Sequence, residues 1–240
     1  REFPMRFVAD FLGNHRMLQR TGRPQWRVVR GGSRNYLGPL VEPFRDRLRL
    51  GCPVRRVLRT EDGVRVATDA GEESFDEVVI AGHADQALRM LADPSDAERE
   101  VLGAFPYQEN AVTLHADPSV LPRRRRAWGS WNFHRPAEER DRTTVTYCMN
   151  LLQSLRTETV FNVTLNEEEA IDPARVLRRL VYSHPVYARG RAAAQARHGE
   201  LIRARRTSFC GAYFGYGFHE DGVRSARKVA EAFGRSLSDA

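Results

Sequence analysis

The chain has 240 residues, of which 41% are hydrophobic, and its mean hydropathy is −0.53. These values describe a globular protein that is long enough for a sizeable core, and no apolar run approaches the roughly 20 residues of a membrane-spanning helix. The formal net charge of +7 permits attraction to nucleic acid, to anionic lipid or to a phosphate-bearing ligand.

The first elements are predicted to be a helix, a strand and a second helix. Residues 1–19 place their apolar side chains on one face, which predicts a helix. Gln25–Arg30 predicts a strand, and the tight turn Gly31–Ser33 leads into a second helix that ends near Leu48. Ser33 is the predicted N-cap of that helix.

Next comes an apolar meander. Leu50–Thr60 and Val64–Thr68 predict two strands joined by a hairpin turn at Glu61–Gly63. Phe75–Ala81 predicts a short buried strand, and the loop after its carboxyl end is a favoured ligand position in α/β sheets. For His83 in that loop we expect a capping or surface role rather than catalysis.

From residue 93 the composition changes and indicates an inserted lobe with a mixed sheet and helices. Asp96–Gly103 predicts a short polar helix. Strands are predicted at Ala111–His115, Thr143–Tyr147 and Phe161–Leu165, a helix or turn at Met149–Leu155, and an amphipathic segment at Pro173–Tyr182.

The C-terminal stretch Phe209–Glu231 reads as a strand, a glycine-bearing turn and a helix that begins near Glu220. A strand followed by such a turn can aim unpaired backbone N–H groups of a helix N-terminus at an anionic or electron-rich ligand. An ordinary strand–turn–helix that closes a domain is the alternative. The helix is predicted to pack through a narrow apolar stripe of Val223, Ala226, Val229 and Ala230.

Two short motifs in this stretch carry a family resemblance. Gly211-Ala212-Tyr213 and Gly217-Phe218-His219-Glu220 resemble the C-terminal flavin-contacting segment of the FAD-dependent amine oxidase and phytoene desaturase-type flavoproteins. The wording FGYGFHEDG is similar to a bacterial branch of predicted NAD/FAD-binding oxidoreductases, which is linked at family level to fatty-acid cyclopropanation or methylation. The resemblance spans nearly all of the chain, as the C-terminal part of a longer family pattern.

The resemblance implies a fold and a division into domains. The implied fold is α/β (mixed α+β), as the C-terminal part of an FAD/NAD(P)-binding two-domain flavoprotein in which a β-meander and helices carry an inserted substrate lobe. The predicted parts are 1–24, helical part of the substrate lobe; 25–92, part of the FAD-binding domain; 93–198, substrate-binding lobe; and 199–240, C-terminal strand and helix of the FAD-binding domain.

The resemblance also implies FAD as the cofactor and an oxidoreductase activity. The residues that it places beside the flavin nucleotide are Val54, Gly211, Ala212, Tyr213, Gly217, Phe218, His219 and Glu220. Val54 matches a Pro-Val pair whose valine backbone meets the adenine, and the His219 N–H lies where a donor could meet the flavin pyrimidine oxygen. Tyr213, Tyr216 and Trp131 are the expected substrate-side residues, with aromatic packing as the alternative.

Two departures from the family pattern shape the functional prediction. The βαβ unit with GxGxxG, which holds the FAD pyrophosphate, is absent from these 240 residues, so we expect a piece of a longer gene or a separate chain that supplies this unit. Glu109–Leu114 lacks the lysine that many amine oxidases place near the flavin, which favours a desaturase- or reductase-like reaction on a small or lipid-like substrate. A truncated, non-catalytic binding module is the alternative.

Other chemistry has little support. The histidines show neither HxxxH nor HxxEH spacing, so no metal site is predicted, and no catalytic residue is assigned. The scattered Cys52, Cys148 and Cys210 indicate a reducing compartment, and we expect a cytoplasmic protein. Arg123–Arg126, near Trp128 and Trp131, could bind phosphate, lipid headgroups or single-stranded nucleic acid, but a solvated loop is the preferred interpretation. Peripheral membrane contact stays open, and no specific nucleic acid is expected.

Overall fold

In the computed structural model, residues 5–22, 24–25, 27–135 and 142–236 are described. The chain divides into two compact units, each described below by itself. Unit 1 comprises residues 1–24, 48–107 and 185–240, and unit 2 comprises residues 25–47 and 108–184. These bounds differ from the predicted domain boundaries, while the assignment of FAD and substrate to particular domains stays a prediction. Both units mix helices and strands, as the predicted α/β class requires.

Unit 1 contains two small sheets. The predicted meander is present as β1 (Val54–Arg59), β2 (Val64–Thr68) and an additional antiparallel strand β3 (Gly71–Phe75). Gly63 in the first turn cannot be replaced without rearrangement, because a Cβ there would lie 2.6 Å from the Phe75 carbonyl oxygen. The second sheet pairs β4 (Val78–Ile80) in parallel with β10 (Thr207–Phe209).

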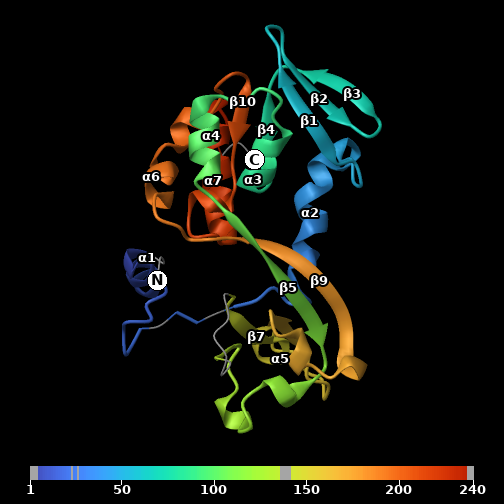
Figure 1. Cartoon of the computed structure of the whole chain (residues 1–240), viewed down its shortest axis with the longest axis vertical. Helices are drawn as coiled ribbons and strands as arrows, with labels where there is room; N and C mark the ends of the chain where they lie inside the picture. The colour runs from blue at the N-terminus through green and yellow to red at the C-terminus, as the bar shows by residue number, and fades with distance from the viewer. Residues whose placement is uncertain (1–4, 23, 26, 136–141, 237–240) are drawn as a thin grey trace. The chain divides into compact units, whose positions relative to one another are not determined.

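The helices of unit 1 accompany the parallel pair, as Figure 1 shows for α3, α4 and α7. They are α1 (Met5–Asn14), α3 (Ala84–Met90), α4 (Asp96–Gly103), α6 (Arg191–Ala196) and α7 (His219–Ala232), with 3-10 turns η7 (His198–Leu201) and η8 (Ala212–Phe214). The fully or almost fully buried apolar side chains of the unit 1 core include Val57, Val64, Leu102, Phe105, Leu201 and Phe209.

A buried ion pair joins β1 to α4. The Arg59 guanidinium donates to both carboxylate oxygens of Glu98, at 2.8 and 3.0 Å, and its Nε donates to Asp93 Oδ1 at 2.8 Å. The side chains of Arg59 and Glu98 are only 3% and 2% exposed. Glu98 also accepts the Ser95 N–H at 2.6 Å while Ser95 Oγ accepts the Glu98 N–H, so the same carboxylate completes the capping box that starts α4.

Unit 2 is built on a five-stranded sheet with the strand order β6-β7-β8-β5-β9. Its strands are β5 (Tyr107–His115), β6 (Trp131–His134), β7 (Thr144–Cys148), β8 (Asn162–Leu165) and β9 (Val176–Pro185). The short helical pieces are η1 (Ser33–Tyr36), α2 (Leu37–Val41), η2 (Glu42–Arg47), η3 (Pro118–Val120), η4 (Arg125–Ala127), α5 (Met149–Leu152), η5 (Glu168–Ala170) and η6 (Pro173–Arg175).

The two faces of this sheet differ in polarity. Because side chains alternate along a strand, the antiparallel registers place one set of residues on each face. The apolar face carries Val112, Leu114, Trp131, Phe133, Val145, Tyr147, Val163 and Leu165. On the opposite face Thr113, His115, Thr144, Thr146, Asn162 and Thr164 are buried. Thr164 Oγ1 lies 2.8 Å from both His115 Nε2 and Thr146 Oγ1, so hydrogen bonds stabilise the buried polar side while Trp131 and Phe133 stay exposed.

Two predicted elements are wrong, and a third segment, whose type the sequence left open, is a strand. Gln25 and Arg27–Arg30 adopt no regular structure, because a strand pattern without a partner strand forms no ladder. Ser33 is not the N-cap: Gly32 occupies that position without a side-chain cap, and the predicted continuous helix breaks where Phe44 follows Pro43 with non-helical dihedrals. The amphipathic segment Pro173–Tyr182 belongs largely to strand β9.

The last helix is present, but its predicted apolar stripe is wrong in half of its positions. Val223 is 52% exposed and Ala226 is also exposed. The buried face instead consists of Asp221, Ser225 and Val229, spaced four residues apart. Two polar residues face inward because their side chains hydrogen-bond to the backbone at the start of the helix, as described below. In the described part of the chain no helix has the length and apolarity needed to cross a bilayer.

Candidate functional site

The C-terminal motif lies at the carboxyl edge of the parallel pair in unit 1. Ile80 pairs with Phe209, so both strands end at the same edge of the sheet. The chain continues into Gly82 and His83 after β4 and into Gly211 after β10. In open α/β sheets ligands bind at this edge, which makes it the candidate site.

Side chains of α7 fix the turn that follows β10. The Gly211 N–H donates to Ser225 Oγ at 2.8 Å, and this hydroxyl donates to the Gly222 carbonyl oxygen at 2.8 Å. Asp221 Oδ2 accepts the N–H of Phe218, the N-cap residue of α7, at 3.0 Å. Asp221 is therefore the side chain that bonds to the N-cap residue.

Two glycines permit this turn. Gly217 has φ +92°, the left-handed region that favours glycine, and its N–H donates to the Ala212 carbonyl oxygen at 3.1 Å. At Gly215 a Cβ would lie 2.3 Å from Asp221 Oδ1. A side chain at Gly215 would therefore collide with Asp221, and one at Gly217 would strain the backbone and lie 2.9 Å from the Tyr187 hydroxyl.

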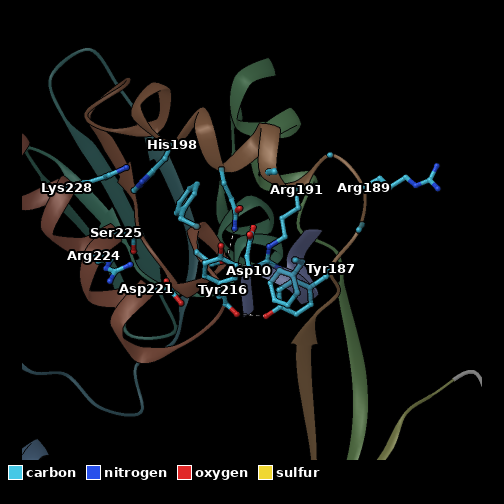
Figure 2. Close-up of a pocket in the computed structure, with 17 residues that line it drawn as sticks. Asp10, Tyr187, Arg189, Arg191, His198, Tyr216, Asp221, Arg224, Ser225 and Lys228 are labelled. Atoms are coloured by element: carbon cyan, nitrogen blue, oxygen red, sulfur yellow. Dashed lines mark hydrogen bonds between the residues drawn. The ribbon is translucent and has the colours of Figure 1, made fainter. Parts of the chain in front are cut away.

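Donors from the segment before α6 and from α6 itself hold the carbonyl side of the turn (Figure 2). Arg191 Nη2 donates to the carbonyl oxygens of Tyr213 and Gly215, at 3.2 and 2.9 Å, and Gln195 Nε2 donates to the same two oxygens at 2.9 and 2.7 Å. The Tyr187 hydroxyl donates to the Tyr216 carbonyl oxygen at 2.5 Å. These three side chains are clamp residues, because they fix the backbone of the turn from one side.

Several buried polar atoms of unit 1 have no hydrogen-bond partner in the structure. His83 Nδ1 and Asp85 Oδ1 lie just beyond the end of β4, and the others are Arg191 Nε, Arg191 Nη1 and the Tyr213 hydroxyl. His83 stands at the N-cap position of α3 but its ring stacks on Tyr107, with centroids 4.5 Å apart, and makes no cap hydrogen bond. Buried polar groups are almost always paired, so these five atoms are exceptions that a bound ligand could explain.

Burial controls the protonation of this region. Burial raises the pKa of the Tyr213 hydroxyl far above its ordinary value and raises the pKa of Tyr107, so both phenols are neutral at physiological pH. The Tyr107 hydroxyl accepts the Ala84 N–H at 3.2 Å. Burial lowers the pKa of His198, whose Nε2 lies 2.8 Å from the Phe209 carbonyl oxygen. Burial also raises the pKa of the Cys210 thiol, which is consistent with a packing role for this cysteine.

A cavity of about 750 Å³ lies beside the clamp residues, entirely within unit 1. Its lining comes from α1, the segment 187–195, the turn and α7. Six of the lining residues are Phe7, Tyr187, Arg191, Tyr216, Asp221 and Lys228.

The structure brings most, but not all, of the predicted site residues together. Gly211, Ala212, Tyr213, Gly217, Phe218, His219 and Glu220 form the turn and the start of α7. Val54 is the first residue of β1 and is 37% exposed, whereas Trp131 belongs to unit 2. The Tyr213 ring is 3% exposed and packs on Phe105, so only its backbone is accessible to a neighbour. No observation tests the cofactor or substrate roles of these residues, and they stay predictions.

Sequence reasoning missed the residues that shape the turn: Tyr187, Arg191, Gln195, Asp221 and Ser225. Asp221 and Ser225 offered a signal, since they lie one helical turn apart directly after the glycines. Arg191 offered none, because nearly every basic residue of the chain is an arginine and most are exposed.

Comparisons with known proteins complete the description. No curated protein matches the chain. The family model described as flavin containing amine oxidoreductase matches residues 3–148, which is more than half of the chain. The matched part ends before the C-terminal motifs that carry the resemblance.

Solved structures show the same fold. Cyclohexylamine oxidase from Brevibacterium oxydans IH-35A is similar with a TM-score of 0.59 at 14% identity, over 98% of this chain and 61% of that chain. A proposed protoporphyrinogen oxidase from Exiguobacterium sp. 255-15 gives a TM-score of 0.57 at 17% identity, over 95% and 57%. The chain thus spans about three fifths of the length of these relatives. The predicted fold is confirmed, the predicted FAD agrees with the flavin that defines the matching family, and the chain belongs to the flavin-containing amine oxidoreductases.

Proposed function

We propose that the protein is an FAD-dependent oxidoreductase, amine oxidase- or desaturase-like, whose flavin lies at the carboxyl edge of β4 and β10. The observation that carries the proposal is the turn between Gly211 and Glu220, which presents a helix N-terminus at that edge in a chain of the flavin-containing family. The first N–H groups of a helix have no partner within the helix and point outward, so they suit an electron-rich ligand.

In this proposal the protein's residues bind and orient the cofactor, which supplies the capacity to accept a hydride or electrons when it is bound. The backbone N–H groups of His219 and Glu220 would donate to the flavin ring, and the positive end of the α7 dipole would favour negative charge there. Gly211 would lie beside the flavin, where its missing Cβ makes room for the Tyr213 ring, and Val54 would contact the adenine end. Arg191 and Gln195 act at one remove, because they hold the carbonyl groups of the turn away from the ligand side.

The substrate that we propose is apolar, of the lipid-like class. The apolar face of the unit 2 sheet supports this choice, because its exposed Trp131 and Phe133 continue a surface of aliphatic and aromatic side chains. The absence of lysine from Glu109–Leu114 points the same way, away from amine oxidation that depends on this residue.

A visible absorbance spectrum tests the flavin proposal. The 240-residue protein is saturated with FAD, desalted and scanned, and the expected result is a retained flavin band. Gly217→Ala and Gly234→Ala form a matched pair, because both glycines have positive φ, +92° and +69°, so alanine strains the backbone at each. We expect Gly217→Ala to retain several-fold less flavin and Gly234→Ala, at the far end of α7, to retain as much as the wild type.

A colourless but folded wild-type protein would contradict flavin binding by this chain and favour a non-catalytic binding module. Equal flavin retention by both glycine variants would contradict the placement of the cofactor at the turn.

The charge of +7 and the exposed Arg123–Arg126 run also suit a polyanion binder. That alternative requires binding to DNA or RNA that weakens steeply with salt, measured on the same flavin-free protein.

A further inference from the structure

The strongest unexplained feature of unit 1 is the buried guanidinium of Arg191. The residue is 5% exposed, and only Nη2 makes hydrogen bonds, both of them to backbone carbonyl oxygens. Nε and Nη1 are buried without a partner. Among the described residues no carboxylate forms an ion pair with Arg191, although an unpaired buried charge is costly.

Aromatic rings stabilise the charge but leave two guanidinium nitrogens without a hydrogen-bond partner. The Arg191 Cζ lies 4.2 Å from the centroid of the Tyr187 ring and 5.6 Å from that of Phe105. A cation–π contact places the charge over an aromatic ring, whereas the guanidinium N–H groups still need hydrogen-bond acceptors. The free N–H groups therefore call for an acceptor, and a charged acceptor matches the unpaired charge best.

The 750 Å³ cavity that Arg191 lines has the size of a small-molecule site. Its walls combine aromatic rings with three basic side chains, those of Arg191, Arg224 and Lys228, against the two acids Asp10 and Asp221. The Asp221 carboxylate accepts the Phe218 N–H, so it is already engaged in the turn. The side chains that line the cavity therefore carry a net positive charge around an otherwise apolar surface.

We propose that this cavity binds a small organic anion, an apolar group that ends in a carboxylate or phosphate, and that Arg191 is its charge partner. The acid group accepts hydrogen bonds from the free N–H groups of Arg191. The apolar group packs on Tyr187 and Tyr216. This proposal can fail independently of the proposed oxidoreductase function, because anion binding is measured on flavin-free protein.

The anionic probes are benzoate and phenyl phosphate, and benzyl alcohol is the neutral probe with the same aromatic ring. Each probe is titrated at constant ionic strength, and binding is followed by the thermal shift of the protein. Wild-type protein is expected to bind both anions and to bind benzyl alcohol at least about 10-fold more weakly. Arg191→Gln is expected to weaken the anions by about 10-fold or more while leaving benzyl alcohol unchanged. Arg189→Gln is the matched control, since Arg189 is exposed and its side chain extends away from the other labelled residues in Figure 2.

Arg191→Lys keeps the test readable if Arg191→Gln fails to fold. Lysine retains the charge but cannot reproduce the fork of donors, so we expect weaker anion binding by a folded protein. Equal anion affinity in wild type and folded Arg191 variants would overturn the proposal, as would a folded wild type that binds neither anion. A last titration with FAD identifies the source of the anion: displacement of benzoate assigns it to the flavin nucleotide, and simultaneous binding assigns it to a second ligand.

Discussion

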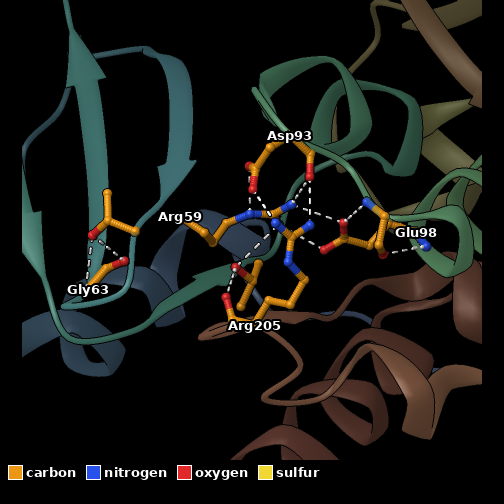
Figure 3. Close-up of polar contacts among 8 residues, drawn as sticks. Arg59, Gly63, Asp93, Glu98 and Arg205 are labelled. Carbon is orange, nitrogen blue, oxygen red and sulfur yellow. Dashed lines mark hydrogen bonds and ion pairs between the residues drawn. The ribbon is translucent and has the colours of Figure 1, made fainter.

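Removal of the Arg59 guanidinium is expected to destabilise unit 1 more than any surface charge change (Figure 3). In Arg59→Met the Glu98 carboxylate would remain 98% buried in its present surroundings without a cationic partner. Breaking a buried pair from one side typically costs about 3–5 kcal/mol. At about 2–4 °C per kcal/mol for a chain of this size, the melting temperature should fall by roughly 6–20 °C.

The assay is urea and thermal unfolding followed by circular dichroism, with two companion variants. Arg55→Met is the control: Arg55 lies on the same strand and pairs with Asp69 at 2.7 Å, but both side chains are more than half exposed, so the melting temperature should hardly change. Glu98→Gln added to Arg59→Met removes the orphaned charge while the amide oxygen can still accept the Ser95 N–H. The double variant should therefore regain part of the lost stability.

Two results would refute this reasoning about Arg59. One is a loss in Arg59→Met no larger than that in Arg55→Met. The other is a double variant as unstable as Arg59→Met alone, which would show that the orphaned Glu98 charge is not the source of the cost.

Two further outcomes follow from the site. Gly215→Ala should lower the free energy of unfolding, measured by urea titration, by about 1–3 kcal/mol, because the new Cβ would overlap the Asp221 carboxylate. Gly199→Ala is the control and should cause no such loss, because the space around its Cβ is open. Equal losses in the two variants would contradict the steric argument. Stability should fall as the pH drops below about 6.5, because the unfolded chain takes up protons at the ordinary histidine pKa while burial keeps the pKa of His198 lower, so the unfolded state binds more protons in this range. His198→Gln should flatten the pH dependence of the urea midpoint, and an unchanged slope would exclude His198 as a contributor.

The elements that sequence could predict are those with local signals. The hairpin turn Glu61–Gly63 predicts β1 and β2, the polar stretch Asp96–Gly103 predicts α4, and the glycines after β10 predict the start of α7. Gln25–Arg30 shows the limit of this reasoning, because alternation describes a strand only where a partner strand is available.

The site was predictable as a segment but not as a set of side chains. The hydrophobic pattern alone predicted that Val223 lies on the buried face of α7. In the structure, hydrogen bonds to the backbone of the turn place Asp221 and Ser225 on that face instead. In unit 2 the buried side of the sheet is the polar one, since Thr146 and Thr164 satisfy each other across neighbouring strands. Tertiary hydrogen bonds of this kind leave no periodic trace in a single sequence.

The parallel pairing of Ile80 with Phe209 has a consequence for the order in which the protein folds. All of residues 108–184 are synthesised between these two strands, so unit 2 can leave the ribosome complete while unit 1 still lacks the partner of β4. Closing so long a loop makes the contact order of unit 1 high and its assembly slow. Until β10 is available, the apolar side chains of β4 remain exposed to solvent. Chaperone binding to nascent chains should therefore be strongest before Thr207–Phe209 emerges from the ribosome.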